Sequence, residues 1–200
     1  MSTAVATARP GAVLADVLFA ATTPRSRVRD VALIAGGAAL TGAAAQFAVP
    51  VPGSPVPVTG QTFAALLIGV SLGPGRAFLS LLCYALAGMA GMPWFAEGTA
   101  GYGMPSFGYI IGMLLAATVV GALARRGGDR SALRTAGTMA VGTAVIYAVG
   151  VPYLALATGM SAGAAVAAGL VPFLIGDALK AALAMGALPV AWKLAGRRED

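Results

Sequence analysis

The chain has 200 residues, of which 58 % are hydrophobic and 10 % are charged, with one cysteine and no histidine. Ordinary soluble domains carry about 25 % charged residues, so this composition predicts an integral membrane protein. The absence of histidine excludes imidazole ligands and bases, and the single Cys83 excludes an intrachain disulfide and a multi-thiolate metal site. From these two features we expect no metal site, no cofactor and no enzymatic activity. The sequence also has no GxxxxGK[ST] phosphate loop, so we expect the chain to have no ATPase activity of its own.

Residues 1–29 are expected to form a cytoplasmic or interfacial segment. Their apolar stretch, residues 11–21, is interrupted by Asp16, and Arg25, Arg27 and Arg29 follow it. A cleaved signal peptide has its positive charges before the apolar stretch, so this order argues against one.

The first membrane span is predicted at residues 30–49, ending at Pro50. It carries Ala35, Ala39 and Ala43 at a spacing of four residues, and such a face of small residues lets another helix approach closely. Packing inside the bundle and contact with a partner protein are both open at this point.

Five further spans are predicted, at residues 62–73, 77–92, 107–124, 133–157 and 162–193, the last interrupted by Pro172. The range 62–73 is too short to cross alone, so the proline-rich loop 50–61 beside it is a candidate pocket wall. The loop at residues 93–106 is rich in glycine and carries Trp94, Phe95 and Tyr102. These aromatic residues suit either interfacial anchors or a lid over a cavity.

The positive charges support this map. They precede the first span, lie in or at the edge of alternate connections, or lie at and beyond the end of the last span, whereas the loops 50–61, 93–106 and 158–161 carry none. The residues are Arg9, Arg25, Arg27, Arg29, Arg76, Arg125, Arg126, Arg130, Arg134, Lys193, Arg197 and Arg198. The positive-inside rule then predicts an all-α protein with six spans and both termini cytoplasmic. We expect residues 30–195 to form one transmembrane domain and residues 196–200 a charged cytoplasmic tail. The net charge of +6 is then explained by the membrane topology and does not indicate nucleic-acid binding.

Asp177 and Lys180 are the two charged residues inside the last span. A charge at membrane depth costs roughly 2.5 to 3.5 kcal/mol or more, so such residues usually mark a site. Their i,i+3 spacing places both on one helix face, and Lys180 lies about 20 Å from the cytoplasmic end at Lys193. An ammonium in a confined pocket suits a carboxylate, so we expect a small amphiphilic acid, held by aromatic neighbours such as Tyr109, Tyr147, Phe95 and Tyr102. A structural ion pair and a proton relay are the alternatives.

Several ordered motifs resemble the BioY family, the biotin-specific S components of energy-coupling-factor transporters. The resemblance covers about residues 14–194. The motifs are Ala45-Gln46, Val49-Pro50, PVPVTGQT at 55–62, GMPWFA at 91–96, Gly108-Tyr109 and PFLIGDALK at 172–180.

The resemblance implies high-affinity capture of biotin at the cytoplasmic membrane, coupled to a transmembrane coupling protein and two cytoplasmic ATPases. It places the family's last-helix Asp and Lys on Asp177 and Lys180, and its fourth-helix aromatic on Tyr109. It also places the face that meets the coupling protein on Ala35, Ala39 and Ala43.

We further expect Thr59 and Gln61 to contact or seal the ligand from the proline-rich loop, with Phe95 and Tyr102 in a lid. The sequence departs from the family at Phe107, where relatives often have a small residue, and at Glu97 and Gly101 in the preceding loop. An S component for another carboxylated vitamin and a structural membrane subunit remain as alternative functions.

Overall fold

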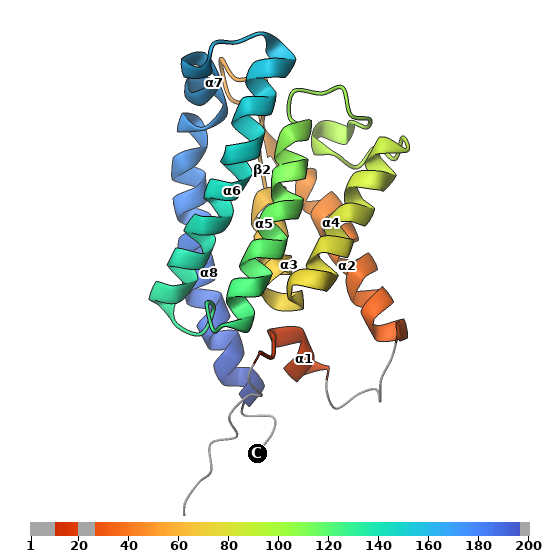
Figure 1. Cartoon of the computed structure of the whole chain (residues 1–200), viewed down its shortest axis with the longest axis vertical. Helices are drawn as coiled ribbons and strands as arrows, with labels where there is room; N and C mark the ends of the chain where they lie inside the picture. Colours follow the sequence, from red (N-terminus) through yellow and green to blue (C-terminus); the bar gives the residue numbers. More distant parts are fainter. Residues whose placement is uncertain (1–10, 20–26, 197–200) are drawn as a thin grey trace, which may run out of the picture.

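The computed structural model describes residues 11–19 and 27–196, and within these ranges the chain is mostly helical (Figure 1). Arg9, Arg25, Arg197 and Arg198, which the topology prediction used, lie outside the described residues. The helices are α1 (Leu14–Leu18), α2 (Arg27–Ala45), α3 (Gln61–Leu72), α4 (Pro74–Met89), α5 (Phe107–Arg125), α6 (Ala132–Thr158), α7 (Ala162–Gly169) and α8 (Leu174–Gly196). Two short strands, β1 (Ala48–Val49) and β2 (Val58–Thr59), and two 3-10 turns, Ala96–Gly98 and Val171–Phe173, complete the order.

Helix α5 lies at the centre of the bundle and packs against α3, α4 and α6 (Figure 1). A side chain at Gly112 would meet the backbone of Ile146 on α6, and one at Gly121 would meet the backbone of Pro74. Glycine therefore lets these backbones approach closely, which is a main source of attraction between helices in lipid. Outside this centre, α2 packs on α4, and α8 packs on α6.

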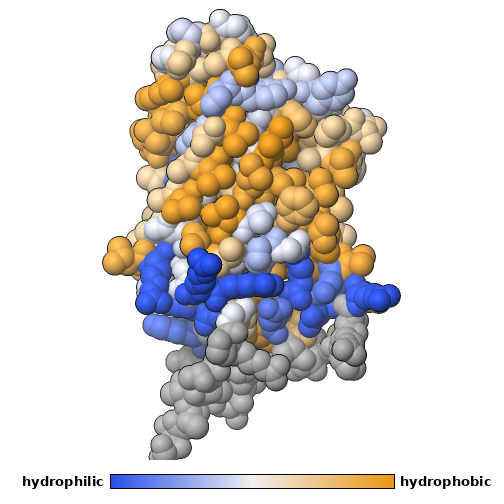
Figure 2. Space-filling view, in the orientation of Figure 1, coloured by the Kyte–Doolittle hydropathy of each residue, from blue (hydrophilic) through white to orange (hydrophobic). Residues whose placement is uncertain are grey.

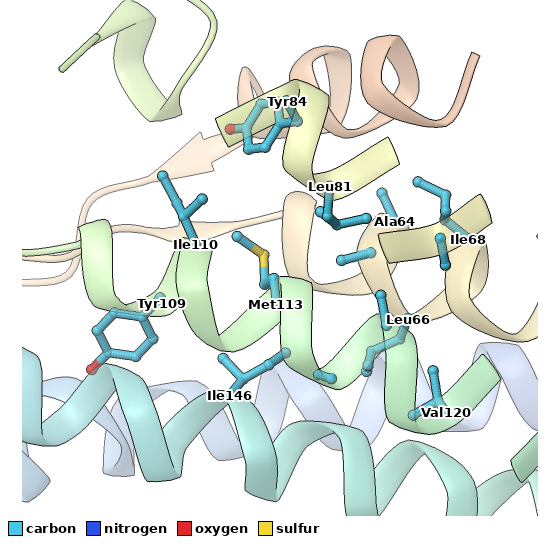
Figure 3. Close-up of a cluster of buried hydrophobic side chains, with 14 of the residues drawn as sticks. Ala64, Leu66, Ile68, Leu81, Tyr84, Tyr109, Ile110, Met113, Val120 and Ile146 are labelled. Carbon is cyan, nitrogen blue, oxygen red and sulfur yellow. The ribbon is translucent and has the colours of Figure 1, made fainter. Parts of the chain in front are cut away.

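The side chains buried between the helices are largely apolar (Figure 3). Leu66 and Ile68 of α3, Leu81 of α4, Met113 of α5 and Ile146 of α6 are each at most 5 % exposed. Because lipid is as apolar as this core, close packing rather than exclusion of water holds the helices together.

Four helical stretches of the described chain are long and apolar enough to cross a membrane: Arg27–Ala45, Phe107–Arg125, Ala132–Thr158 and Ala162–Ala195. Helix α3 has 12 residues. At 1.5 Å per residue it is about 18 Å long, well short of a hydrocarbon core of about 30 Å. This agrees with the expectation that residues 62–73 cannot cross alone.

The surface fits a membrane protein. In the view of Figure 2, hydrophobic residues cover most of the bundle, and a band of hydrophilic residues crosses the visible face near the end at which α1 lies. The first turn of α4, which carries Arg76, lies at this end (Figure 1). So do the last residue of α5, Arg125, and the connection to α6, which carries Arg126 and Arg130.

The N-terminal segment is folded against this same end. Val13 is fully buried, and the short helix α1 packs against α3 and α8. The Arg76 guanidinium pairs with Asp16 of α1 at 2.7 Å and with Asp30 of α2 at 3.0 Å. Part of the segment predicted to be interfacial therefore fills the space below the short helix α3.

Two further features refine the sequence prediction. The break expected at Pro172 is present, since α7 ends at Gly169, a 3-10 turn holds Pro172, and α8 begins at Leu174. The proline-rich loop folds back as a small hairpin in which Ala48 pairs with Thr59. The hairpin fixes Thr59 beside the first turn of α3.

Candidate binding cavity

A cavity lies where α3, α6 and α8 meet the hairpin. The loop and hairpin, three helices and two aromatic residues contribute its walls. The lining includes Val56 and Thr59 of the loop and hairpin, Gln61, Thr62, Phe63 and Leu66 of α3, Met139, Thr143, Ile146 and Tyr147 of α6, Asp177, Lys180 and Ala181 of α8, and Tyr109 and Phe173. The empty space between these walls, its mouth included, is about 680 Å³. Small-molecule sites typically measure roughly 300 to 1,000 Å³, so the cavity has the size of such a site.

Asp177 and Lys180 face this cavity together from consecutive turns of α8. The Lys180 ammonium lies 3.2 Å from Asp177 Oδ1, and the two side chains are 19 % and 14 % exposed. Lys180 also donates a hydrogen bond of 2.8 Å to the Thr62 hydroxyl on α3. Because an ammonium has three N–H groups, one remains for a ligand.

The two tyrosines expected at the site line the cavity, but their hydroxyls differ in role. The Tyr147 hydroxyl donates to Asp177 Oδ2, so this carboxylate accepts hydrogen bonds from both Tyr147 and Lys180. The Tyr109 hydroxyl instead donates to the Gly169 carbonyl at 2.7 Å. The two rings meet edge to face at 6.4 Å, and together they form an aromatic wall.

Thr59 and Gln61 also line the cavity, as the sequence predicts, and they are 7 % and 5 % exposed. Gln61 Oε1 accepts a hydrogen bond of 2.9 Å from the Tyr84 hydroxyl, which fixes the amide group. Both side chains thus present polar atoms to a largely apolar cavity from fixed positions.

Phe95 and Tyr102 are not in the cavity lining. The Phe95 side chain is fully buried, packs 5.1 Å from the Tyr84 ring, and fills the space that a side chain at Gly88 would need. Tyr102 is 67 % exposed, and its carbonyl accepts a hydrogen bond from the Tyr153 hydroxyl. In this structure the loop 93–106 therefore borders the cavity through Ala96 and Ser106 instead.

The family model that matches the chain is the BioY family, over residues 17–197. The chain therefore belongs to the BioY family. It is 36 % identical over 162 residues to the probable biotin transporter BioY of Pyrococcus horikoshii, covering 80 % of this chain and 93 % of that protein. It is 32 % identical over 139 residues to the biotin transporter BioY of Thermotoga maritima, covering 68 % and 80 %.

A solved structure also resembles this BioY-family chain. It is the crystal structure of the S-component for biotin from an ECF-type ABC transporter, with a TM-score of 0.76 and 22 % sequence identity. The match covers 86 % of this chain and 95 % of that one. The bundle is therefore the S-component fold, and the resemblance inferred from the motifs is confirmed.

The alanine face of α2 points away from the bundle of this BioY-family chain. Ala35, Ala39 and Ala43 are all exposed, whereas Gly37 and Thr41 on the other face are buried. A side chain at Gly37 would collide with Ser80 of α4, so that opposite face is the one that packs inside. In the described structure these alanines therefore face away from the other helices, and contact with a partner protein stays a prediction.

The sequence analysis missed Thr62, which accepts a hydrogen bond from Lys180. It also missed the apolar wall residues Met139, Ile146 and Phe173. Thr62 is the last residue of the motif PVPVTGQT at 55–62 and directly follows Gln61. Its place beside a predicted site residue could therefore have indicated that it belongs to the site. The apolar residues carry no such signal, because they are indistinguishable from lipid-facing residues before the helices are placed.

Proposed function

We propose that this chain binds biotin and takes it up across the cytoplasmic membrane as the S component of an energy-coupling-factor transporter. The observation that carries the proposal is the half-buried Asp177–Lys180 pair that lines a cavity of a BioY-family fold. The relatives named biotin transporters support the choice of ligand.

In this proposal Lys180 meets a polar group of biotin, and Asp177 orients Lys180. Asp177 already accepts from Tyr147 and Lys180, so its main task is to hold the ammonium in place. Tyr109, Tyr147 and the apolar wall hold the uncharged parts of the ligand, and Thr59 and Gln61 contact it from the hairpin side.

The proposed topology has six spans, with both termini in the cytoplasm and residues 30–195 as one transmembrane domain. Arg76, Arg125, Arg126 and Arg130 at the end of the bundle near α1 support a cytoplasmic orientation for that end. The cavity then lies toward the outer half of the membrane, where the hairpin and the loop 93–106 are.

The proposed partners are a transmembrane coupling protein and two cytoplasmic ATPases. The exposed alanines of α2 support this, because a helix of the coupling protein can approach such a face closely. The missing phosphate loop also supports it, since energy must then enter from other subunits.

Uptake of labelled biotin by cells that express the chain, with a panel of unlabelled vitamins as competitors, tests the proposal. We expect unlabelled biotin to abolish the signal and other carboxylated vitamins to leave it unchanged. Competition by another vitamin at lower concentration than biotin would reassign the ligand. Normal uptake by the Asp177→Leu, Lys180→Met variant would instead make the ion pair structural.

A further inference from the structure

A second hollow lies on the outside of the bundle, between α6, α7 and α8. Its empty space, the open side included, is about 1,290 Å³, and this lateral groove runs along α6 from Ala136 to Pro152. Ala140, Ala144 and Ala148 of α6 are exposed and line it. Side chains this small leave open the space that larger ones would fill, so a furrow remains along the helix.

The lining of the lateral groove is apolar except near its middle. Among the described residues that line it, only Thr143, Tyr147 and Asp177 carry polar side-chain groups. Its walls belong to stretches long and apolar enough to cross a membrane, Ala132–Thr158 and Ala162–Ala195. The groove therefore opens to the hydrocarbon of the membrane, and an empty furrow there would cost its walls the contacts of close packing.

The length of the groove fits one acyl chain of a lipid. Residues 136–147 of α6 rise by about 16 Å along the helix, and half of a hydrocarbon core of about 30 Å is about 15 Å. An acyl chain that starts beside Ala136 therefore ends beside Tyr147, whose hydroxyl bonds to Asp177. The chain end of a lipid from the leaflet nearer α1 thus reaches the polar middle of the groove.

The end of the bundle nearer α1 offers positive charge to a headgroup. Arg134 of α6 and Lys193 in the last turn of α8 are exposed, and neither forms an ion pair within the described part of the chain. Asp129 of the adjoining connection is paired with Arg130 at 3.5 Å, so it does not neutralise them. Trp192, beside Lys193, is a residue type that marks the headgroup level of a bilayer. A negatively charged phosphate therefore complements this end.

A second copy of this chain is a poorer occupant of the groove. Copies in one membrane share the orientation that their arginines set, so a docked copy would bring its own positive end beside Arg134 and Lys193. Like charges at one level repel each other, whereas a phosphate is attracted.

We propose that the lateral groove binds a phospholipid of the leaflet nearer α1, with one acyl chain along α6 and the phosphate at Arg134 and Lys193. This lipid site lies outside the ligand cavity and does not depend on biotin being the ligand. The two hollows share part of one wall, since Tyr147 and Asp177 line both. The chain end of the lipid therefore covers these two side chains from the membrane side.

Photolabelling of the purified, detergent-solubilised full chain tests the lipid site. The probe is phosphatidylglycerol with a diazirine at the end of one acyl chain, and peptide mass spectrometry locates the label. We expect the label on the groove-lining parts of α6 and α8, near Tyr147. Ala144→Phe, Ala148→Phe fills the groove and should lower this labelling roughly 10-fold, because the added rings occupy the space of the chain.

Val141 provides a matched control, because it is exposed on α6 but lies outside the groove lining. Val141→Phe should keep the wild-type labelling.

The headgroup contact is tested by titrating phosphatidylglycerol onto the protein in native mass spectrometry. In Arg134→Gln, Lys193→Gln we expect the affinity for this lipid to fall roughly 5-fold for each residue, the typical contribution of a basic residue near anionic lipid. Arg27→Gln removes an exposed arginine at the start of α2 and should keep the wild-type affinity.

A label spread evenly over the exposed faces of α4 and α6 of the wild-type protein would overturn the proposal, and this result needs no variant to fold. Unchanged labelling in folded Ala144→Phe, Ala148→Phe would also overturn it. A detergent-solubilised dimer that this variant makes monomeric would assign the groove to a second copy instead. None of these results bears on biotin binding, which is measured separately.

Discussion

Asp177 accepts hydrogen bonds from two side chains on different helices, Tyr147 of α6 and Lys180 of α8. Both bonds are partly shielded from water, so each contributes more than a fully exposed contact would. The sequence predicted this pair and both tyrosines at the site from the cost of charge in a membrane and from the family motifs. It could not predict which tyrosine bonds to Asp177, because that depends on how α6 rotates relative to α8.

Tyr147→Phe removes one of these bonds and keeps the ring. We expect biotin affinity to fall about 10-fold, because a hydrogen bond to a charged group is worth roughly 1.5 to 3 kcal/mol and repacking recovers part of it. Calorimetric titration measures the change. Tyr153→Phe is the control, since the Tyr153 hydroxyl bonds to the Tyr102 carbonyl outside the cavity. Unchanged affinity in Tyr147→Phe would show that Asp177 needs only Lys180.

Asp129, in the connection between α5 and α6, gives a prediction about pH. Its side chain is fully buried and accepts a hydrogen bond of 2.7 Å from Trp192. Burial raises the pKa of Asp129 above its ordinary value of 3.8, although Trp192 and Arg130 partly counteract it. The folded state therefore binds the proton more tightly than the unfolded state. The associated stability is present below the ordinary pKa and is lost as pH rises through the raised one.

Asp129→Asn keeps an acceptor for Trp192 but cannot ionise. We expect the melting temperature of the wild-type protein, relative to this variant, to fall by a few degrees as pH increases above about 4. A change of 1 kcal/mol corresponds to about 2 to 4 °C for a chain of this size. Melting curves across the pH range in one detergent measure the difference. A difference that stays constant with pH would contradict the raised pKa.

Among the elements, the long apolar helices were easier to predict than the segments around the cavity. The predicted range 107–124 agrees with α5, and the predicted range 133–157 agrees with α6. The aromatic residues of the loop 93–106 were harder to place. Phe95 turns into the core because Gly88 leaves room for its ring, and spacing along the sequence cannot reveal that vacancy.

The exposed alanine face of helix α2 gives a prediction about transport. Ala39→Leu adds bulk to the exposed alanine face, so we expect biotin uptake to fall at least 10-fold while binding and melting temperature stay within error. Transport assays and calorimetry on the same variant separate the two effects. Leu40→Phe adds bulk at a neighbouring exposed position of α2 and should retain uptake. Loss of binding together with uptake in Ala39→Leu would mean that this face supports the bundle itself.

For the whole molecule, composition and the distribution of arginine predicted a helical membrane bundle, because both follow from lipid as a solvent. The filling of the space below α3 by α1 was not predictable. It depends on Val13 reaching the bundle and on Arg76 joining Asp16 to Asp30, contacts between segments far apart in the sequence. The charged pair alone was enough to predict the class of ligand from the sequence. The residues that form the cavity around the pair could be identified only once the helices were packed.

The most direct test of the account is equilibrium binding of labelled biotin to the purified chain, with Lys180→Ala alongside. We expect saturable one-to-one binding to the wild-type protein and at least a 100-fold loss of affinity in Lys180→Ala, because the polar group of biotin at this position would lose its charged partner. Both proteins must elute as folded bundles. Absence of binding by the wild-type protein, or equal binding by Lys180→Ala, would contradict a biotin site built on this lysine.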